Sequence, residues 1–362
     1  MPELRPNADY AVAQEPINQA LPERDSGSFH PFWNWKTFLS LVLTAGLLAF
    51  LASHIDSAAL WQDLAGANTV YLTLGLLAHY ATYPIRGLRW RRTLGDLGKE
   101  TPASRFGLIV FFYNAVDNVL PAKLGDLYAA HLARLNFRIR RSSALGSLVF
   151  LRLIDVWIVL SLATASAWYV FSAHLPADVT WVLGGGLLLA IAVSAVLLTM
   201  LILGKTTPDW IPERVAEMID DFHKTLWPDR KDRPAIVLLT ITIWALETLW
   251  MFCLVRAFGV ELSFWGLIFL TQAPLLASAF PLTPSGAGAV EITMFGCLRL
   301  LGVPSPLAIS ITVINRVIDY WLHIGLGGLT WALRKPLGLH TLRELDTLAP
   351  LRAYPTKLNG QD

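Results

Sequence analysis

The sequence predicts an all-α polytopic membrane protein with six transmembrane helices and two re-entrant helical hairpins in an inverted repeat. Three observations predict this fold. Hydrophobic residues make up 54% of the 362 residues and charged residues only 15%, whereas about a quarter of the residues of a soluble domain are charged. Long apolar stretches occur in two matching series. Lysine and arginine are concentrated in alternate connections, as in membrane proteins with basic cytoplasmic loops.

Six apolar stretches are long enough to cross about 30 Å of hydrocarbon at about 1.5 Å per residue. They cover residues 36–56, 68–88, 145–172, 179–204, 234–257 and 306–333. Residues 1–35 precede them and begin polar and mixed in charge, without the apolar centre of a signal peptide, so they predict a disordered cytoplasmic arm. Residues 336–362 predict a cytoplasmic tail.

Two further apolar stretches, residues 105–135 and 262–302, are interrupted near their middles. Proline and glycine stop a helix there, so neither stretch predicts a single span. A re-entrant hairpin, which enters and leaves on one side, fits both. Irregular backbone at membrane depth requires surrounding protein or a water-filled cavity. The predicted tips contain Pro121 and Gly125 in the first hairpin, and Pro284, Gly286 and Gly288 in the second.

The third and sixth predicted spans each contain the motif Arg-x-x-Asp, as Arg152 to Asp155 and as Arg316 to Asp319. Residues three apart share one helix face and can pair. Charges at mid-bilayer are costly and usually face a polar cavity or a partner. We therefore expect both arginines to face one shared cavity, held by Asp155 and Asp319. The carboxylates of the hairpin tips are the alternative partners.

Span, span, hairpin and span with Arg-x-x-Asp occur in this order twice, over residues 36–172 and 173–335. Each repeat has three crossings, so the second must be inverted, as in many transporters. All the basic connections then face the cytoplasm with both termini inside, which predicts a bacterial cytoplasmic (inner) membrane protein. Those connections are residues 86–105, 134–141, 205–233 and 334–357.

Residues 208–227 interleave apolar and charged side chains near a helical period. This pattern predicts an amphipathic helix in the inner membrane interface. Two interpretations are open at this point. The helix lies beside a lipid entrance, or it is a membrane-parallel connector between the repeats.

Cationic side chains at membrane depth are the candidate binding groups: Arg86 and Arg89 at the end of the second span, Lys123 at the first hairpin tip, and Arg152 and Arg316. Planar guanidinium groups suit phosphate oxygens, and a helix that restarts at a tip points its positive end at the break. The alternatives are a membrane anchor for the arginine cluster and a plain turn at each tip. The remaining candidate substrate-binding residues are Asn118, Asp126, Asp155, Glu291 and Asp319.

In order and spacing, these motifs resemble the flippase-like membrane family that includes the transmembrane domain of lysylphosphatidylglycerol synthases. The resemblance covers about residues 35–335 and rests on Arg86–Trp90, Asn118–Asp126, Arg152-x-x-Asp155, Pro284–Glu291 and Arg316. The family usually shows Pro-x-Arg-x-Gly-Glu followed by another arginine. Here Lys123 and Asp126 replace the first arginine and the glutamate, and Ala129 stands at the later arginine. The resemblance implies movement of an anionic or polyprenyl-linked lipid between leaflets.

The function predicted is translocation of an anionic glycerolipid or a polyprenyl-phosphate-linked lipid through a polar cavity between the repeats. A membrane-embedded enzyme acting on a lipid head group competes with it, and so does a small-solute or ion transporter. The sequence lacks a His/Cys metal cluster, a nucleotide loop and a nucleophile beside a base, so we expect no cofactor, no metal and no catalytic residue. No nucleic-acid partner is expected.

Without an ATP-binding motif, transport is expected to be passive or coupled to a gradient. The carboxylates Asp155, Asp319, Glu291 and Glu247 are able to carry protons or simply to neutralise the arginines. The histidines His79, His131 and His323 are isolated in sequence and predict packed or interfacial side chains. A homo-oligomer is compatible with the sequence.

Overall fold

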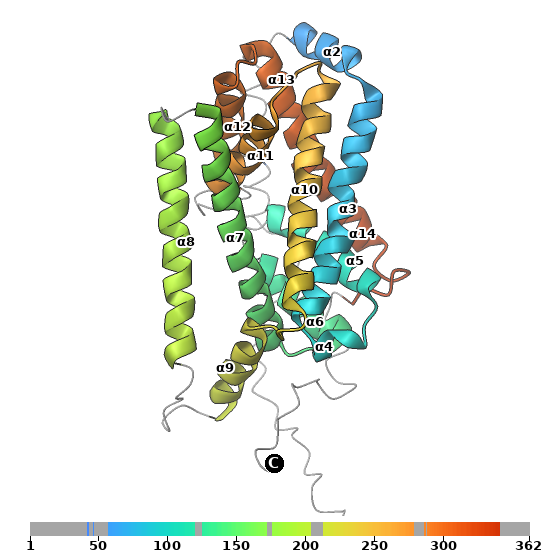
Figure 1. Cartoon of the computed structure of the whole chain (residues 1–362). Coiled ribbons are helices and arrows are strands. Elements are labelled where there is room, and N and C mark those ends of the chain that lie inside the picture. The colour runs from blue at the N-terminus through green and yellow to red at the C-terminus, as the bar shows by residue number, and fades with distance from the viewer. Residues whose placement is uncertain are drawn as a thin grey trace, which may run out of the picture.

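The computed structural model describes residues 42, 46, 57–119, 125–171, 176–203, 213–278, 286 and 288–340. Within these residues the secondary structure is helical. The helices are α2 (Ser57–Gly66), α3 (Thr69–Thr93), α4 (Asp96–Lys99), α5 (Ala103–Val119), α6 (Gly125–Phe137), α7 (Arg141–Phe171), α8 (Ala177–Leu203), α9 (Glu213–Leu226), α10 (Arg233–Ala257), α11 (Phe264–Ser278), α12 (Ala289–Leu300), α13 (Ser305–Arg316), the π-helix η4 (Val317–Leu322) and α14 (His323–Ala332). The long helices lie side by side along the molecule (Figure 1).

Three helices of the described chain are long and apolar enough to cross a membrane: α7, α10 and the continuous helix Ser305–Ala332. They match three of the predicted spans, and α8 matches the predicted span 179–204. Helix α3 covers the predicted span 68–88, but polar residues such as His79 and Arg86 lower its hydropathy. The predicted span 36–56 lies outside the described residues except at positions 42 and 46. The chain is a helical membrane protein, and the count of six spans stays a prediction.

Two pairs of short helices occupy the places of the predicted hairpins. Helix α5 packs against α6, and α11 packs against α12. Their lengths are 17, 13, 15 and 12 residues, below the roughly 20 residues that a span requires. The first pair lies toward the end of the molecule that holds α4 and α9, and the second toward the end that holds α2 (Figure 1). Pro121, Lys123 and Pro284 lie outside the described residues.

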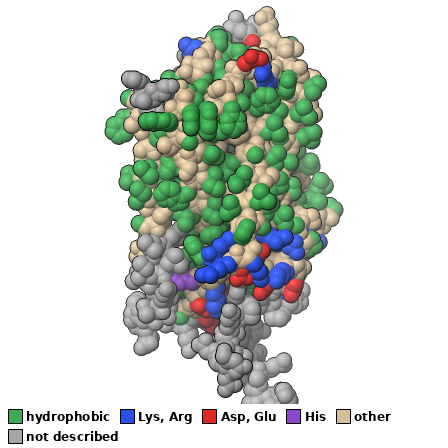
Figure 2. Space-filling model, viewed as in Figure 1, with side chains coloured by type: hydrophobic (Ala, Val, Ile, Leu, Met, Phe, Trp, Pro, Cys, Tyr) green, Lys and Arg blue, Asp and Glu red, His purple; other side chains and the backbone are tan. Residues whose placement is uncertain are grey.

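The buried core of the described residues comprises three clusters, and one of them, around Leu160 and Trp244, joins α7 to α8, α10 and α11 across the two halves. A second cluster, around Trp90 and Phe106, joins α3, α5, α6 and α7. A third, around Trp250 and Phe269, joins α10, α11, α12 and α13. Hydrophobic side chains are spread over the upper part of the visible described surface, and lysine and arginine gather in a band near the end that holds α9 (Figure 2). This surface is that of a protein embedded in lipid with one basic end.

The predicted amphipathic segment forms α9, which begins at Glu213, and residues 208–212 lie outside the described part. It packs against the beginning of α7. Arg140 Nη1 donates to Asp221 Oδ2 at 2.8 Å, and this hydrogen bond raises the pKa of the guanidinium. A Cβ on Gly146 would lie 2.3 Å from the carbonyl oxygen of Phe222. These contacts hold α9 closely on α7, and both interpretations of the segment stay predictions.

Helices α3 and α5 cross at two glycines, and this crossing provides a test of the packing. A Cβ on Gly87 would lie 2.2 Å from the backbone nitrogen of Gly107. We expect Gly87→Ala to lower the free energy of unfolding by about 1–3 kcal/mol, since the two backbones must separate. In contrast, a Cβ on Gly328 in α14 meets no atom within 4 Å, so Gly328→Ala should be neutral or slightly stabilising. Thermal unfolding in detergent measures the stability of both variants. Equal losses of stability in Gly87→Ala and Gly328→Ala would contradict the close approach of α3 and α5.

Candidate functional site

A cavity of about 310 Å³, lined by both charged and apolar side chains, lies among the helices of both halves. It is lined by side chains of α3, α5, α7, α8, α10, α11, α12, α13 and η4. Six of the predicted site residues line it: Arg86, Asn118, Arg152, Asp155, Arg316 and Asp319. Arg89, Asp126 and Glu291 are not in the lining and instead pair with other polar side chains. The two Arg-x-x-Asp motifs, far apart in sequence, therefore meet at one cavity.

The aspartate of the first motif pairs with α3 instead of with its own helix. Arg89 Nη1 donates to Asp155 Oδ1 at 2.6 Å and Nη2 donates to Oδ2 at 2.8 Å. Thr240 Oγ1 accepts a further hydrogen bond from Arg89 Nη1 at 3.1 Å. The predicted pairing of Asp155 with Arg152 is therefore wrong. The physical reason is geometric: an arginine from the neighbouring helix meets both carboxylate oxygens at once, which is the strongest form of this contact.

The arginines of the two motifs pair with the hairpin carboxylates, the alternative partners named from the sequence. Arg152 Nε and Nη2 donate to the two oxygens of Asp126, each at 2.9 Å. Arg316 Nε lies 2.7 Å from Glu291 Oε1, and both side chains are only 3% exposed. Asp126 lies in the first turn of α6, and Glu291 lies in the first turn of α12, so each carboxylate begins the second helix of its own hairpin. The two halves thus repeat one arrangement, in which a span arginine holds the start of α6 or α12.

Carboxylates of the chain itself occupy the beginnings of these two hairpin helices. The backbone nitrogen of Gly125 donates to Asp117 Oδ1 at 2.9 Å, and that of Gly288 donates to Glu291 Oε2 at 2.8 Å. Gly286 and Gly288 have φ angles of 67° and 89°, which favour glycine. The predicted anion site at each helix start is thus at least partly filled, because a carboxylate there already compensates the helix dipole.

The second motif differs from the first because it enters a π-helix. Arg316 is the last residue of α13, and Asp319 lies in η4. A π-helical turn is wider than an α-helical turn and is frequent at functional sites. Asp319 is 46% exposed, and His79 Nε2 lies 3.6 Å from its Oδ1. The predicted pairing of Asp319 with Arg316 is therefore also wrong, and the aspartate faces the cavity.

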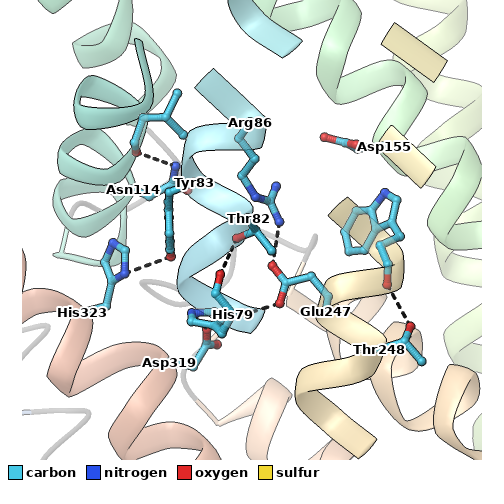
Figure 3. A network of polar contacts seen from close by, with 12 residues as sticks. His79, Thr82, Tyr83, Arg86, Asn114, Asp155, Glu247, Thr248, Asp319 and His323 are labelled. Carbon is cyan, nitrogen blue, oxygen red and sulfur yellow. Dashed lines mark hydrogen bonds and ion pairs between the residues drawn. The ribbon is translucent and has the colours of Figure 1, made fainter. Parts of the chain in front are cut away.

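The network around His79 was not predicted as a site (Figure 3). His79 Nδ1 lies 3.2 Å from Glu247 Oε2, and Arg86 Nη2 donates to Glu247 Oε1 at 2.8 Å. Tyr83 and His323 are hydrogen bonded at 2.9 Å. His79 and His323 are therefore not isolated, although they are packed. The signals available in the sequence were the helical spacing of His79, Tyr83 and Arg86, and the glutamate within an apolar span.

Further lining residues also escaped the sequence prediction: Asn114, Asp117, Trp244, Trp250 and Asn315. Each lies in a helix whose own sequence does not show which face meets the cavity. In the described part of the chain no group of His, Cys, Asp and Glu is arranged to hold a metal ion.

Four arginines at the cavity or beside it have carboxylate partners, but they differ in access. Arg89 and Arg316 are 4% and 3% exposed, whereas Arg86 and Arg152 are 21% and 40% exposed. A guanidinium has five donors, and the ion pairs of Arg86 and Arg152 with described residues use only part of them. These two arginines therefore present donors to the cavity. Arg89 and Arg316 are enclosed by protein, and Lys123 lies outside the described residues.

The fold and the cavity define a class: a helical integral membrane protein with a polar, charge-paired interior. Residues 37–327 match the model of the lysylphosphatidylglycerol synthase TM region. The chain therefore belongs to that family.

Archaeal membrane proteins are among its relatives. A UPF0104 membrane protein of Methanocaldococcus jannaschii is 24% identical over 207 residues, covering 57% of this chain and 88% of that protein. A UPF0104 membrane protein of Methanothermobacter thermautotrophicus is 22% identical over 324 residues, 81% of this chain and 94% of that protein. Glycosyltransferase AglD of Haloferax volcanii is 24% identical over 307 residues, 74% of this chain but only 49% of AglD.

Proposed function

We propose that the chain moves a lipid with an anionic head group, an anionic glycerolipid or a polyprenyl-phosphate-linked lipid, between membrane leaflets. The head group passes through the polar cavity while the tail stays in hydrocarbon between helices. One observation carries this proposal: charged residues from both halves line a single cavity of about 310 Å³. Ionisable residues that face a cavity within a membrane commonly mark a substrate path.

The anionic part of the head group is proposed to contact Arg152 and Arg86. Arg152 binds Asp126 through Nε and Nη2, so among the described residues Nη1 is left for a phosphate oxygen. Arg86 contacts Glu247 through Nη2, so Nε and Nη1 remain without a hydrogen bond to any residue that the structure describes. The carboxylate partners hold both guanidinium groups in place, and an oriented guanidinium suits phosphate geometry. The buried arginines Arg89 and Arg316 support the helices and are not proposed as contacts.

The topology proposed is six spans and two re-entrant hairpins in an inverted repeat, with both termini in the cytoplasm of a bacterial cell. The opposite placement of the two short helix pairs supports it (Figure 1). The matching contacts of Arg152 with Asp126 and of Arg316 with Glu291 support an internal repeat. The basic band at one end supports the orientation, because positive loops stay inside (Figure 2).

A reconstituted system tests the transport proposal through Arg152. We expect Arg152→Gln to slow movement of a fluorescent anionic lipid in vesicles by about tenfold or more, since a hydrogen bond to a charged group contributes about 1.5–3 kcal/mol. Reduction of the outer-leaflet label by dithionite gives the rate. Arg230→Gln is the matched control, because Arg230 is exposed and does not line the cavity. Equal movement of neutral and anionic lipids, unchanged in Arg152→Gln, would contradict the proposal.

A second candidate is a step in the transfer of a lipid-linked head group, and the likeness to a protein named glycosyltransferase AglD favours it. The same vesicles distinguish the two functions. Mass spectrometry of lipids recovered after the assay shows an unchanged lipid mass if the protein only moves the lipid. When a sugar donor is added to the same vesicles, a new head group on the lipid would support the enzyme instead.

A further inference from the structure

The buried His79 has a carboxylate at each of its ring nitrogens. The side chain is 3% exposed. Nδ1 lies 3.2 Å from Glu247 Oε2 on α10, and Nε2 lies 3.6 Å from Asp319 Oδ1 on η4. Arg86 contacts the other oxygen of Glu247 at 2.8 Å, which favours the ionised carboxylate. His79 therefore lies between two acidic groups from two different elements (Figure 3).

A neutral imidazole has one N–H and satisfies only one of these carboxylates. The shorter contact to the ionised Glu247 assigns that proton to Nδ1. Nε2 then carries a lone pair directed toward Asp319, and it has no hydrogen-bond partner among the described residues. The distance of 3.6 Å exceeds a hydrogen bond. A second proton, on Nε2 or on Asp319, satisfies both groups at once and draws η4 toward α3.

His323 provides a contrast to His79, because its two hydrogen bonds fix which ring nitrogen carries the proton. Its Nε2 lies 3.2 Å from the carbonyl oxygen of Phe111, so that nitrogen must donate. Nδ1 is left as acceptor for the hydroxyl of Tyr83 at 2.9 Å. A neutral His323 thus satisfies both contacts.

The other titratable or charged groups that surround His79 are Tyr80, Tyr83 and Arg86 on α3, Glu247 on α10, Asp319 on η4 and His323 on α14.

We propose that His79 Nε2 and the Asp319 carboxylate form a proton-binding site that couples lipid movement to the transmembrane proton gradient. This rests on the proposed lipid transport. Asp319 is 46% exposed and lines the cavity together with His79, so cavity water delivers the proton. On protonation the imidazolium holds Glu247 and Asp319 together. On deprotonation η4 is released from α3, and a π-helix at this point allows the shift.

Lipid vesicles at a series of pH values test the proposal with the full chain. Histidine changes charge between about pH 5 and pH 8, so we expect the wild-type rate to change by about tenfold across that range. His79→Gln, which cannot be protonated, should vary by less than about twofold over the same range. His323→Gln is the matched control and should keep the pH profile of the wild type. Asp319→Asn tests the second half of the site and should flatten the profile as His79→Gln does.

A pH gradient across the vesicles provides the second measurement. The wild-type protein should accumulate the labelled anionic lipid in one leaflet, whereas His79→Gln should only equilibrate it. A wild-type rate that is flat with pH and indifferent to the gradient would overturn the proton site while leaving lipid transport intact. Absence of lipid movement by the wild type at every pH would instead overturn the proposed function. A pH profile retained in His79→Gln and Asp319→Asn would assign the proton to another group and overturn this site.

Discussion

Replacing Arg316 with glutamine is expected to lower the free energy of unfolding by about 3–5 kcal/mol, because the substitution leaves a buried carboxylate without its partner. Arg316 and Glu291 are each 3% exposed and form an ion pair at 2.7 Å. The guanidinium also lies 4.3 Å from the centre of the Tyr320 ring. Loss of Arg316 therefore removes the contact that holds the start of α12 against α13. Unfolding by denaturant in mixed micelles measures the effect.

The equivalent change in the other half is the control. Arg152→Gln removes the contact with Asp126, but these side chains are 40% and 25% exposed. Cavity water can solvate the remaining carboxylate, so we expect a loss of at most about 1 kcal/mol. Similar losses of unfolding free energy in Arg316→Gln and Arg152→Gln would show that burial does not determine how much each ion pair stabilises the protein.

The pair formed by Arg89 and Asp155 is expected to show a large coupling energy in a double-mutant cycle. Arg89→Gln and Asp155→Asn each leave a buried charge unpaired, whereas the double variant removes both charges. Because the two side chains make two hydrogen bonds at 2.6 and 2.8 Å, we expect a coupling of at least about 1.5 kcal/mol. The cycle is measured by equilibrium unfolding of the four proteins.

A second cycle provides the comparison within one helix. Arg152 and Asp155 share a face of α7 but pair with different partners, Asp126 and Arg89. Their coupling should be below about 0.5 kcal/mol. A larger coupling for this pair than for Arg89 and Asp155 would restore the pairing that the sequence predicts.

The sequence was informative wherever the composition of a short stretch decides which helix forms there. Apolar stretches of sufficient length correspond to α7, α8, α10 and the helix Ser305–Ala332. Proline and glycine in two apolar stretches predicted the division into two pairs of short helices. The amphipathic period predicted α9. Each of these depends on local composition, because helix formation and membrane insertion respond to neighbouring residues along the chain.

Pairing among the charged residues depended on contacts that the sequence does not contain. Two residues three apart on a helix are able to pair, yet Asp155 is bound by an arginine on α3 and Arg152 by a carboxylate on α6. Several carboxylates compete for each arginine inside the bundle, and the geometry of neighbouring helices selects among them. The sequence therefore identified most of the charged residues around the cavity. It named the hairpin carboxylates only as the alternative partners of the two motif arginines, and it did not indicate the pairing of Arg89 with Asp155.

The sequence by itself determined that this chain is a helical membrane protein, which stretches are apolar, and that charges occur at membrane depth. Only the tertiary structure decided that Asp319 turns into the cavity through a π-helix and that His79 lies between Glu247 and Asp319. The physical reason is the range of the interactions. Hydrophobicity is a property of each segment, whereas an ion pair or a proton site needs atoms from several helices within about 3–4 Å.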